Sequence, residues 1–449
     1  MDQRIPTGLQ GKFWLVSADM GYGHQRAIFP LKPLARDGVI INANNGPGAS
    51  IKEIRLWNRM QQIYEFMSRA GTLPVIGRFL AHLLDKMLYI PNFYPLSDRS
   101  KPTLQVFFLS YFLNKGLCKS VNDYTKNPEL PFITSFYASA LAADLEEHEV
   151  VYCIITDTDI NRVWVAKKPS QSRIIYFAAG TVSAQRLHSY GVTENNILVT
   201  GFPLPLELLG DRNLNVLKDN LKKRLFNLDQ KNIFHGLYKH STRAFLGERN
   251  FEELQENEKN HCITITFAVG GAGAQKEIGK QIVGSLAKKI ASNEVKLNLV
   301  AGIRYELYEY FEKLKEDIKG GVDGIKVIWA ETNEGYFELF NECLKTTDIL
   351  WTKPSELTFY CALGIPLILS PAIGPQERCN QKWIREIGAG FKQGNPENTD
   401  QWLFDLINKG RIAEAAWNGF LKARKFGTYN IIEFLERGTF TSSNDPLKR

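Results

Sequence analysis

The stretch Asp348–Asn380, DILWTKPSELTFYCALGIPLILSPAIGPQERCN, decides the fold. Its apolar segment 348–351 predicts a buried strand, and the apolar run 357–363 predicts a helix that Gly364 ends in a left-handed cap. Residues 366–370 predict a second buried strand. Strand, loop, helix and strand in this order form a unit of a parallel sheet. Such sheets bind ligands at the carboxyl ends of their strands.

Periodicity alone supports no more than this unit, but the order of three motifs adds to it. They are Lys353-Pro-Ser-Glu-Leu-Thr, Ala362-Leu-Gly-Ile-Pro-Leu-Ile and Gly374-Pro-Gln-Glu-Arg-Cys-Asn380. Together they resemble the donor-binding segment of B-type glycosyltransferases. The families nearest in pattern are monogalactosyldiacylglycerol synthase, the processive diacylglycerol glucosyltransferases and the lipid-intermediate N-acetylglucosaminyltransferase of peptidoglycan synthesis. The resemblance implies that Lys353, Gln376, Glu377 and Asn380 hold the sugar.

Composition is that of a globular protein with more than one core. A chain of 449 residues predicts two domains, and 44% hydrophobic with 23% charged residues is ordinary for globular chains. No apolar run approaches the roughly 20 residues that span a bilayer, and the first residues show no apolar signal-peptide core. The six cysteines form no C-x-x-C pair, which favours free thiols over a disulfide framework or a zinc site. We therefore expect a reducing, cytoplasmic location.

A glycine turn near the N-terminus carries the first candidate catalytic residue. Strand-like residues 13–18 run into Asp19-Met-Gly-Tyr-Gly-His-Gln-Arg-Ala27, where two glycines permit a tight turn before a helix near His24. In the resembled lipid glycosyltransferases this loop also ends in Gly-His, and the histidine faces the acceptor. The resemblance thus implies that His24 is the base, because a neutral imidazole accepts a proton. A purely capping role for His24 is the alternative.

A second candidate follows the strand predicted at 151–156. Asp157 begins the segment Asp-Thr-Asp-Ile-Asn-Arg-Val-Trp, which resembles the same family's N-domain loop. That family has a histidine between the aspartate and the tryptophan, whereas this chain has Asn161 and Arg162 there. Asp157 could orient His24 or accept the hydroxyl proton itself. Capping of the next helix is the alternative.

Residues 51–101 carry an excess of basic charge next to aromatic side chains. Eight Lys or Arg face four Asp or Glu in this segment. Apolar residues recur at helical spacing on both sides of 71–74, which predicts two amphipathic helices. One interpretation is a surface that lies in a membrane interface and contacts the acceptor, with Arg55, Trp57, Arg59, Phe79 and Tyr89 as its residues. The other is an ordinary pair of helices packed on the sheet. No nucleic-acid-binding motif accompanies the basic charge.

A second series of strands begins at 263–267 and is followed by Ala268-Val-Gly-Gly-Ala-Gly-Ala-Gln275. This glycine-rich stretch predicts a phosphate-binding loop that uses the backbone amides of Gly270, Gly271 and Gly273. We expect Ser355 to bind the phosphate as well. Two later strand ends, at 301 and 329, lead to the remaining candidates. Arg304, Ala330, Glu331 and Thr332 are the expected nucleotide-binding residues.

The resemblance implies an α/β fold of two Rossmann-like domains of the GT-B type, facing across a cleft, with C-terminal helices that cross back to the N-domain. We expect an acceptor domain at 1–210, a linker and charged insertion at 211–260, a nucleotide-sugar domain at 261–427, and a return helix and tail at 428–449. The implied function is metal-independent hexosyl transfer from a nucleoside-diphosphate sugar, expected to be a UDP-sugar, to a hydroxyl acceptor, expected to be a lipid. The expected partners are that donor, that acceptor and an anionic membrane surface at the inner face of the cell membrane. No cofactor, metal or nucleic acid is expected.

Two departures from the family pattern keep alternatives open. Ser355 and Glu356 stand where the family has glycines, and a carboxylate beside a diphosphate would repel it. Cys361 stands where the family has a ribose-binding glutamate, and a thiol cannot accept from two hydroxyls. A non-catalytic nucleotide- or sugar-binding protein on the same scaffold is therefore the alternative, as is a nucleotide-sugar hydrolase or epimerase.

Overall fold

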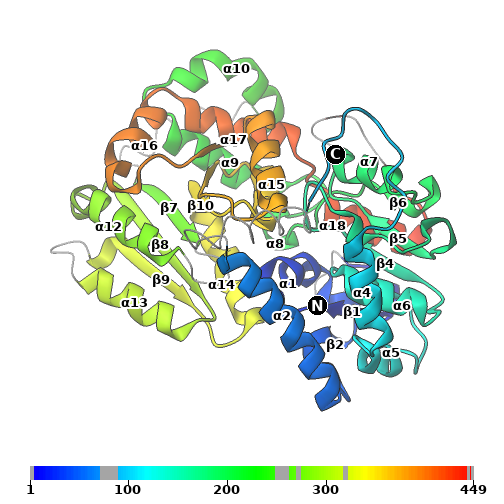
Figure 1. Cartoon of the computed structure of the whole chain (residues 1–449). Coiled ribbons are helices and arrows are strands. Elements are labelled where there is room, and N and C mark those ends of the chain that lie inside the picture. The colour runs from blue at the N-terminus through cyan, green and yellow to red at the C-terminus, as the bar shows by residue number, and fades with distance from the viewer. Residues whose placement is uncertain are drawn as a thin grey trace. The chain divides into compact units, whose positions relative to one another are not determined.

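The computed structural model describes residues 5–70, 89–247, 262–268, 275–316, 322–441 and 445. The chain forms two compact units. The first consists of Met1–Pro203, Ile373–Asn380 and Phe426–Ser442, and the second of Leu204–Ala372, Gln381–Lys425 and Ser443–Arg449. Figure 1 labels the elements of both. The first unit thus ends near the expected residue 210, at Pro203, and takes up two later segments of the chain.

The first unit is built on a sheet of six described strands in the order β2-β1-β3-β4-β5-β6. All its strand pairs are parallel. Apolar and β-branched residues fill these strands, as expected for a parallel sheet that is covered on both faces. The strands are β1 (Phe13–Ser17), β2 (Ala35–Asn42), β3 (Phe132–Thr134), β4 (Val151–Ile154), β5 (Ile174–Phe177) and β6 (Ile197–Leu198).

Helices cover both faces of this sheet and share one apolar core with it. That core joins strand residues such as Trp14 and Phe132 to Trp57, Leu109 and Phe136 from the helices and loops. The helices are α1 (Tyr22–Ile28), α2 (Ile51–Ala70), α4 (Leu104–Asn114), α5 (Lys119–Thr125), α6 (Tyr137–Leu145), α7 (Thr181–Ser189) and α18 (Gly427–Arg437).

Helix α18 belongs to the first unit although it comes last in the chain. Its Asn430 side chain donates to the carbonyl of Thr200 at 2.8 Å. The ring of Phe434 lies 5.9 Å from that of Phe177 on β5. At Gly427 any Cβ would stand 2.1 Å from the carbonyl oxygen of Phe202, so only glycine fits this close approach. The expected return of the last helix to the N-domain is confirmed.

The second unit is built on another sheet of six described strands, in the order β12-β11-β10-β7-β8-β9. All its pairs are parallel. If β7 to β12 are renumbered 1 to 6 and the sheet is read from β9 to β12, the order is 3-2-1-4-5-6. This is the strand order of dinucleotide-binding sheets. The strands are β7 (Ile263–Ala268), β8 (Val295–Gly302), β9 (Ile325–Trp329), β10 (Ile349–Thr352), β11 (Leu367–Leu369) and β12 (Gly390–Lys392).

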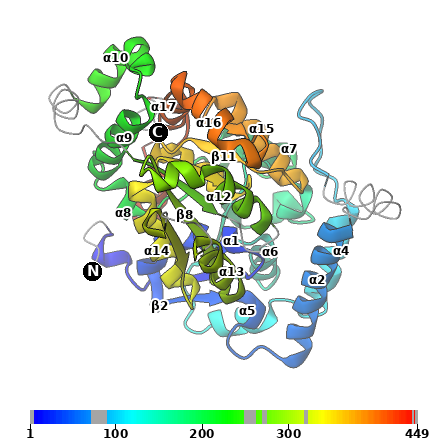
Figure 2. The ribbon, with the colours of Figure 1, turned by 90° about the vertical axis from the view of Figure 1, so that its left-hand side faces the viewer.

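Helices flank the second sheet as well, and Figure 2 shows α12 and α13 in front of β8. A 3-10 helix, η8 (Glu356–Leu363), replaces the α-helix expected between β10 and β11, and Gly364 ends it at a φ of 67° as predicted. The α-helices are α8 (Leu206–Leu209), α9 (Asn215–Leu228), α10 (Ile233–Leu246), α12 (Lys276–Ala291), α13 (Tyr305–Glu316), α14 (Asn333–Thr346), α15 (Pro375–Ile387), α16 (Thr399–Asn408) and α17 (Arg411–Lys422). The start of α15, up to Asn380, belongs to the first unit.

The charged segment after Asp211 differs from the linker that its composition predicts. Its described part forms α9 and α10, and both are part of the second unit. Arg224 of α9 is buried and donates to the carbonyls of Thr347, Leu363 and Gly364 at 2.7, 3.1 and 3.3 Å. These bonds cap the ends of α14 and η8, and burial lowers the pKa of Arg224 to about 10. Arg224 therefore stabilises the fold of the second unit.

The predicted fold class of two Rossmann-like domains is confirmed by these two parallel sheets. Two strands, β3 and β12, escape prediction because each has three residues and no alternating pattern.

Candidate active site

In the first sheet the strand order reverses between β1 and β3. Chain connections leave these two strands in opposite directions, so the carboxyl ends of β1 and β3 flank a crevice in which such sheets bind ligands. The loop after β1 supplies His24, in the first turn of α1, and the loop after β3 supplies Ser135. The predicted catalytic histidine therefore lies at the position where this topology favours a site.

His24 is held in one orientation by the neighbouring loop. Its Nδ1 lies 2.6 Å from the carbonyl oxygen of Ser135, and the hydroxyl of Ser135 donates to the carbonyl of His24 at 2.6 Å. A carbonyl only accepts, so Nδ1 carries the proton and Nε2 is the basic nitrogen of the neutral ring. The edge of Phe136 contacts the imidazole at 4.9 Å between ring centroids. This geometry suits a proton acceptor.

Asp157 follows β4, the next strand of the sheet after β3, and it is bonded to Asn380. Nδ2 of Asn380 donates to Oδ1 of Asp157 at 2.9 Å. The other end of the same amide, Oδ1 of Asn380, accepts from the backbone N–H and from the hydroxyl of Thr158 at 2.9 and 2.8 Å. Asn380 thus fixes the carboxylate of Asp157.

This placement corrects the sugar-binding role that the resemblance implies for Asn380. The side chain of Asn380 is fully buried, and both ends of its amide are engaged by the loop after β4. An amide used in this way has little capacity left for a sugar hydroxyl. Asn380 supports Asp157 instead.

Two buried arginines beside this loop are structural. Arg186 forms a bidentate pair with Asp159, with both N···O distances 2.8 Å, and the ring of Phe93 lies 4.0 Å from its guanidinium carbon. Arg162 donates to the carbonyls of Ser100, Val165 and Ala166, and burial lowers its pKa. Arg162 therefore does not replace the acid–base histidine of the resembled loop. The partnership of Asp159 and Arg186 carries no sequence signal, since 27 residues separate them.

In the second sheet the strand order reverses between β7 and β10. The loop after β7 contains Gly270, Gly271 and Gly273, which lie outside the described residues. The loop after β10 contains Lys353 and Ser355, both half-buried, and Ser355 precedes the first residue of η8. The carboxyl ends of β7 and β10 are neighbours, and the loop with Lys353 and Ser355 begins at this edge.

Of the residues that depart from the family pattern, Glu356 and Cys361 are buried, whereas Ser355 is half-buried. Glu356 is 7% exposed, so its side chain does not stand out from the loop after β10. Cys361 is fully buried within η8, and burial raises the pKa of its thiol, which therefore stays neutral. Its backbone approaches α17 so closely that a Cβ on Gly419 would lie 2.5 Å from the carbonyl oxygen of Cys361. Cys361 serves packing.

The expected nucleotide-binding residues follow β8 and β9. Arg304 is exposed after β8, and after β9 Ala330 is half-buried and Glu331 is exposed. The hydroxyl of Thr332 accepts from the N–H of Gly335 at 3.2 Å and so caps α14. An aromatic cluster that the sequence does not single out lies beside them: the ring centroids of Tyr305 and Tyr308 are 5.5 and 5.3 Å from that of Trp329.

Gln376 and Glu377 occupy the first turn of α15, where both are half-buried. A carboxylate oxygen of Glu377 accepts from the backbone N–H of Ile373 at 2.8 Å, which ties the preceding loop to the helix. Glu377 therefore has a local structural role in addition to any contact with a sugar.

The basic region resolves into an exposed face and a buried one. Arg55 and Arg59 are exposed on α2, and Tyr89 is exposed after the residues that are not described. Trp57 is 1% exposed and packs 5.9 Å from the ring of Phe136, so its predicted surface role is wrong. Helical spacing identifies an apolar face but does not tell whether protein or lipid covers it. Phe79 lies outside the described residues.

An exposed apolar face appears instead on α4, which the sequence prediction does not include. Leu104, Phe107, Phe108 and Tyr111 share one side of this helix and are all exposed. Two lysines lie against it: the Nζ atoms of Lys167 and Lys115 are 4.8 Å from the ring of Phe107 and 5.6 Å from that of Tyr111. The uncharged run LQVFFLSYFLN is the sequence feature that could have indicated this apolar helix.

Within the described ranges, no cluster of three or more His, Cys, Asp or Glu side chains could hold a metal ion. Among the helices of those same ranges, none combines the length and the apolarity that crossing a bilayer requires.

No protein-family model matches this chain. Among curated proteins it is similar to the processive diacylglycerol β-glucosyltransferases of Bacillus pumilus and Bacillus subtilis, at 23% and 22% identity over 256 residues. These matches cover 57% of this chain and 53% of each relative, so the chain spans about half the length of the curated relatives it matches.

Among solved structures, S. aureus MnaA with UDP has a TM-score of 0.48 at 10% identity, and covers 94% of this chain and 95% of its own. Acinetobacter baumannii MurG has a TM-score of 0.44 at 14% identity, with coverage of 95% and 99%. The resemblance to processive diacylglycerol glucosyltransferases that the motifs indicate is thus confirmed by a similarity over more than half of the chain.

Proposed function

We propose that this protein is a glycosyltransferase that moves a hexose from a UDP-sugar to a hydroxyl of a lipid acceptor at a membrane surface. The observation that carries the proposal is the imidazole of His24, held at the reversal point of the first sheet with Nδ1 protonated and Nε2 basic. The similarity to proteins named processive diacylglycerol β-glucosyltransferase supports the donor and acceptor classes.

In the proposed reaction, Nε2 of His24 takes the proton of the acceptor hydroxyl as its oxygen bonds to the anomeric carbon. The bond from that carbon to the diphosphate breaks, and the nucleoside diphosphate leaves with the electron pair. Asp157, fixed by Asn380, stabilises the imidazolium that forms or orients the acceptor. Both residues belong to the first unit, which is therefore the proposed acceptor domain.

The proposed donor-binding groups come from the segments that follow β7, β9 and β10 and from the start of α15. Backbone amides of Gly270, Gly271 and Gly273, together with Ser355, would neutralise the leaving diphosphate. Lys353, Gln376 and Glu377 would hold the sugar, and the segment Ala330–Thr332 would contact the base. Charge neutralisation of this kind needs no metal, so we expect transfer to continue in excess EDTA.

The proposed lipid acceptor requires that the first unit reach a membrane. The exposed face of α4, with Lys115 and Lys167 against its aromatic rings, supports this. Aromatic side chains beside lysines are typical of helices that lie in the interface of an anionic bilayer. Arg55 and Arg59 add exposed positive charge on the same unit.

The central test combines binding and turnover. Calorimetry against UDP-glucose, UDP-galactose, UDP-N-acetylglucosamine and a GDP-sugar should find one UDP-sugar that binds more tightly than UDP. Transfer of its radiolabelled sugar to diacylglycerol in vesicles should then be detectable and should be lost in His24→Ala. Binding without transfer to lipid or water would favour the non-catalytic alternative, and release of free or isomerised sugar would favour hydrolysis or epimerisation.

The membrane proposal has its own test. Sedimentation with vesicles should increase with anionic lipid content and decrease with salt, since screening acts over about 10 Å at 0.1 M. Phe107→Ser with Phe108→Ser should release the protein from the vesicles. Leu145→Ser is the matched control, because Leu145 is also an exposed apolar residue of the first unit but lies on α6. If Leu145→Ser reduced vesicle binding as much as the double variant of α4 does, a role for α4 would be contradicted.

A further inference from the structure

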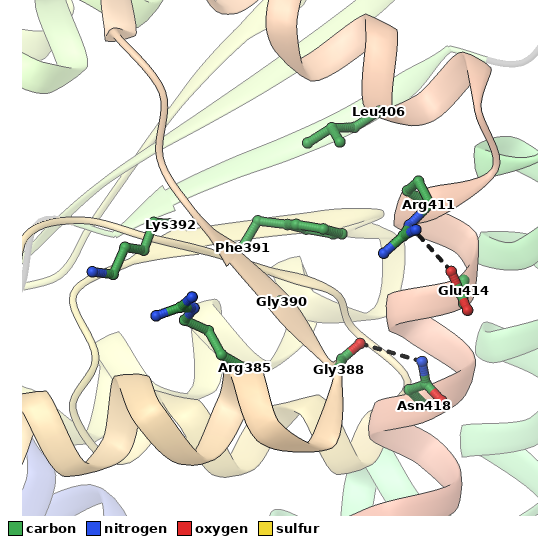
Figure 3. Close-up of a pocket in the computed structure, with 9 residues that line it drawn as sticks. All are labelled: Arg385, Gly388, Gly390, Phe391, Lys392, Leu406, Arg411, Glu414 and Asn418. Atoms are coloured by element: carbon green, nitrogen blue, oxygen red, sulfur yellow. Dashed lines mark hydrogen bonds and ion pairs between the residues drawn. The ribbon is translucent and has the colours of Figure 1, made fainter.

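A hollow of about 540 Å³ lies in the second unit beside the edge strand β12. Residues from the end of α15, from β12, and from α16 and α17 line it (Figure 3). Neighbouring strands are about 4.8 Å apart, so β12 lies about 10 Å from β10 across β11. The hollow is therefore separate from the loops that carry Lys353 and Ser355.

The lining is rich in positive charge. It contains Arg385, Lys392 and Arg411, and its carboxylate is that of Glu414. Both oxygens of Glu414 are occupied, one by Arg411 at 3.2 Å and the other by the hydroxyl of Tyr238 at 3.0 Å. Among the described residues, Arg385 and Lys392 have no acidic partner. Two uncompensated cations therefore face this hollow.

The arrangement of the side chains suits an anion that carries an apolar body. Figure 3 shows Arg385 and Lys392 together on one side of β12, whereas the ring of Phe391 points to the other side, toward Arg411 and Leu406. The side chain of Asn418 donates to the carbonyl of Gly388 at 3.4 Å. This bond engages the carbonyl oxygen, whose partial negative charge would otherwise repel an anion. Phe391 and Leu406 supply apolar walls.

The backbone of β12 adds donors. β12 pairs with β11 on one side and forms the edge of the sheet. Toward β11, the carbonyl of Ala389 accepts from Leu367 and the N–H of Gln393 donates to Leu369. Residues of a parallel strand alternate in their bonding direction, so Gly390 and Lys392 turn their N–H groups to the open edge.

From these observations we propose that the hollow is a second ligand site, which binds a small phosphorylated molecule independently of the donor site. Arg385 and Lys392 bind the phosphate with the outward N–H groups of β12, and the rest of the molecule lies against Phe391 and Leu406. The volume is within the range of about 300–1,000 Å³ that holds small ligands in proteins. Guanidinium and ammonium groups together are the side chains that phosphate prefers.

Pyrophosphate is the probe, and the readout is the rate at which Lys392 of the full chain is acetylated, followed by mass spectrometry. Pyrophosphate should protect Lys392 saturably, and sodium chloride of equal ionic strength should not. Lys382, on the same helix as Arg385 but with its side chain 76% exposed, is the control and should keep its rate. Arg385→Ala should weaken the protection about tenfold, as expected from the loss of one charge-assisted hydrogen bond.

Lys353→Ala separates this site from the donor site. It should leave the protection of Lys392 unchanged while it weakens binding of the UDP-sugar. Failure of the donor-site proposal can therefore be distinguished from failure of this one. Equal protection of Lys382 and Lys392 would overturn the proposal, because it would indicate general screening. Full protection in Arg385→Ala would overturn it as well.

Discussion

The two sheets have the same parallel pairing, but they place different chemical groups where their strand order reverses. At β1 and β3 the first sheet presents side chains, namely the imidazole of His24 and, one strand further, the carboxylate of Asp157. At β7 and β10 the second sheet presents the short loop before η8, and the glycines predicted to bind phosphate follow β7 in the sequence but lie outside the described residues. Side chains can carry protons, whereas backbone amides bind anions. The difference suggests proton transfer in the first unit and donor binding in the second.

The largest expected effect tests proton transfer in the first unit. His24→Ala should lower turnover by ~10²–10⁴, the usual contribution of a general base, with the calorimetric affinity for UDP-sugar nearly unchanged. His188→Ala is the control, because His188 is exposed on α7 of the same unit. If Asp157→Asn abolishes transfer and His24→Ala does not, then Asp157 is the base.

The next effect concerns the stability of the second unit. Arg224→Met should lower its free energy of unfolding by about 2–4 kcal/mol, because the carbonyls at the ends of α14 and η8 lose their donor. Urea titration followed by tryptophan fluorescence measures this change. Lys223→Met, at the exposed neighbouring position, should cost far less. A similar loss in both variants would contradict the capping role of Arg224.

A third effect depends on pH and also belongs to the second unit. Burial raises the pKa of Asp348 from 3.8 to about 6, although the N–H of Thr264 and the side chain of Asn227 donate to it. The folded state then binds the proton more tightly than the unfolded chain. The stability that this proton contributes is complete below pH 4 and is lost as the pH rises through 6.

Asp348→Asn removes this titration. Relative to the wild type, its free energy of unfolding should rise between pH 4 and pH 7 by up to about 3 kcal/mol, since one pKa unit corresponds to about 1.4 kcal/mol. Urea titrations of both proteins at several pH values measure the difference. A constant difference across that range would show that the carboxyl of Asp348 does not titrate there.

The smallest effect separates two residues of α15 that the sequence predicts to act alike. Gln376→Ala should weaken UDP-sugar by ~1–3 kcal/mol and hardly change the affinity for UDP, as expected for one lost hydrogen bond to the sugar. Asn380→Ala should leave the ratio of the two affinities unchanged, because its amide bonds to Asp157 and Thr158. If Asn380→Ala changed the ratio of the affinities for UDP-sugar and UDP, the predicted contact between Asn380 and the sugar would be supported after all.

Much of the fold is predictable because the longer strands are continuous apolar runs that end in glycine or polar turns. The predicted strand at 325–329 matches β9, and Gly364 has the left-handed conformation that its position requires. The glycines beside His24 likewise indicate the turn that positions it. These features depend on neighbours in the chain, so the sequence reveals them.

The errors concern contacts between distant parts of the chain. Trp57 has the spacing of a surface residue on an amphipathic helix, but the core beneath α2 covers it. Asn380 stands in a sugar-binding motif, but 222 residues separate it from the Thr158 hydroxyl that it binds. Arg224 is one of several cations on α9, and it is buried because its acceptors lie more than a hundred residues further on.

The docking of α18 on β5 has a consequence for biosynthesis. The first unit is complete only when Gly427–Arg437 has left the ribosome, after the body of the second unit. At 5–20 residues per second, that interval is about 10–45 s. Until then the surface that α18 covers, including the ring of Phe177, stays open on the nascent chain. Synthesis of α18 therefore completes the core of the first unit.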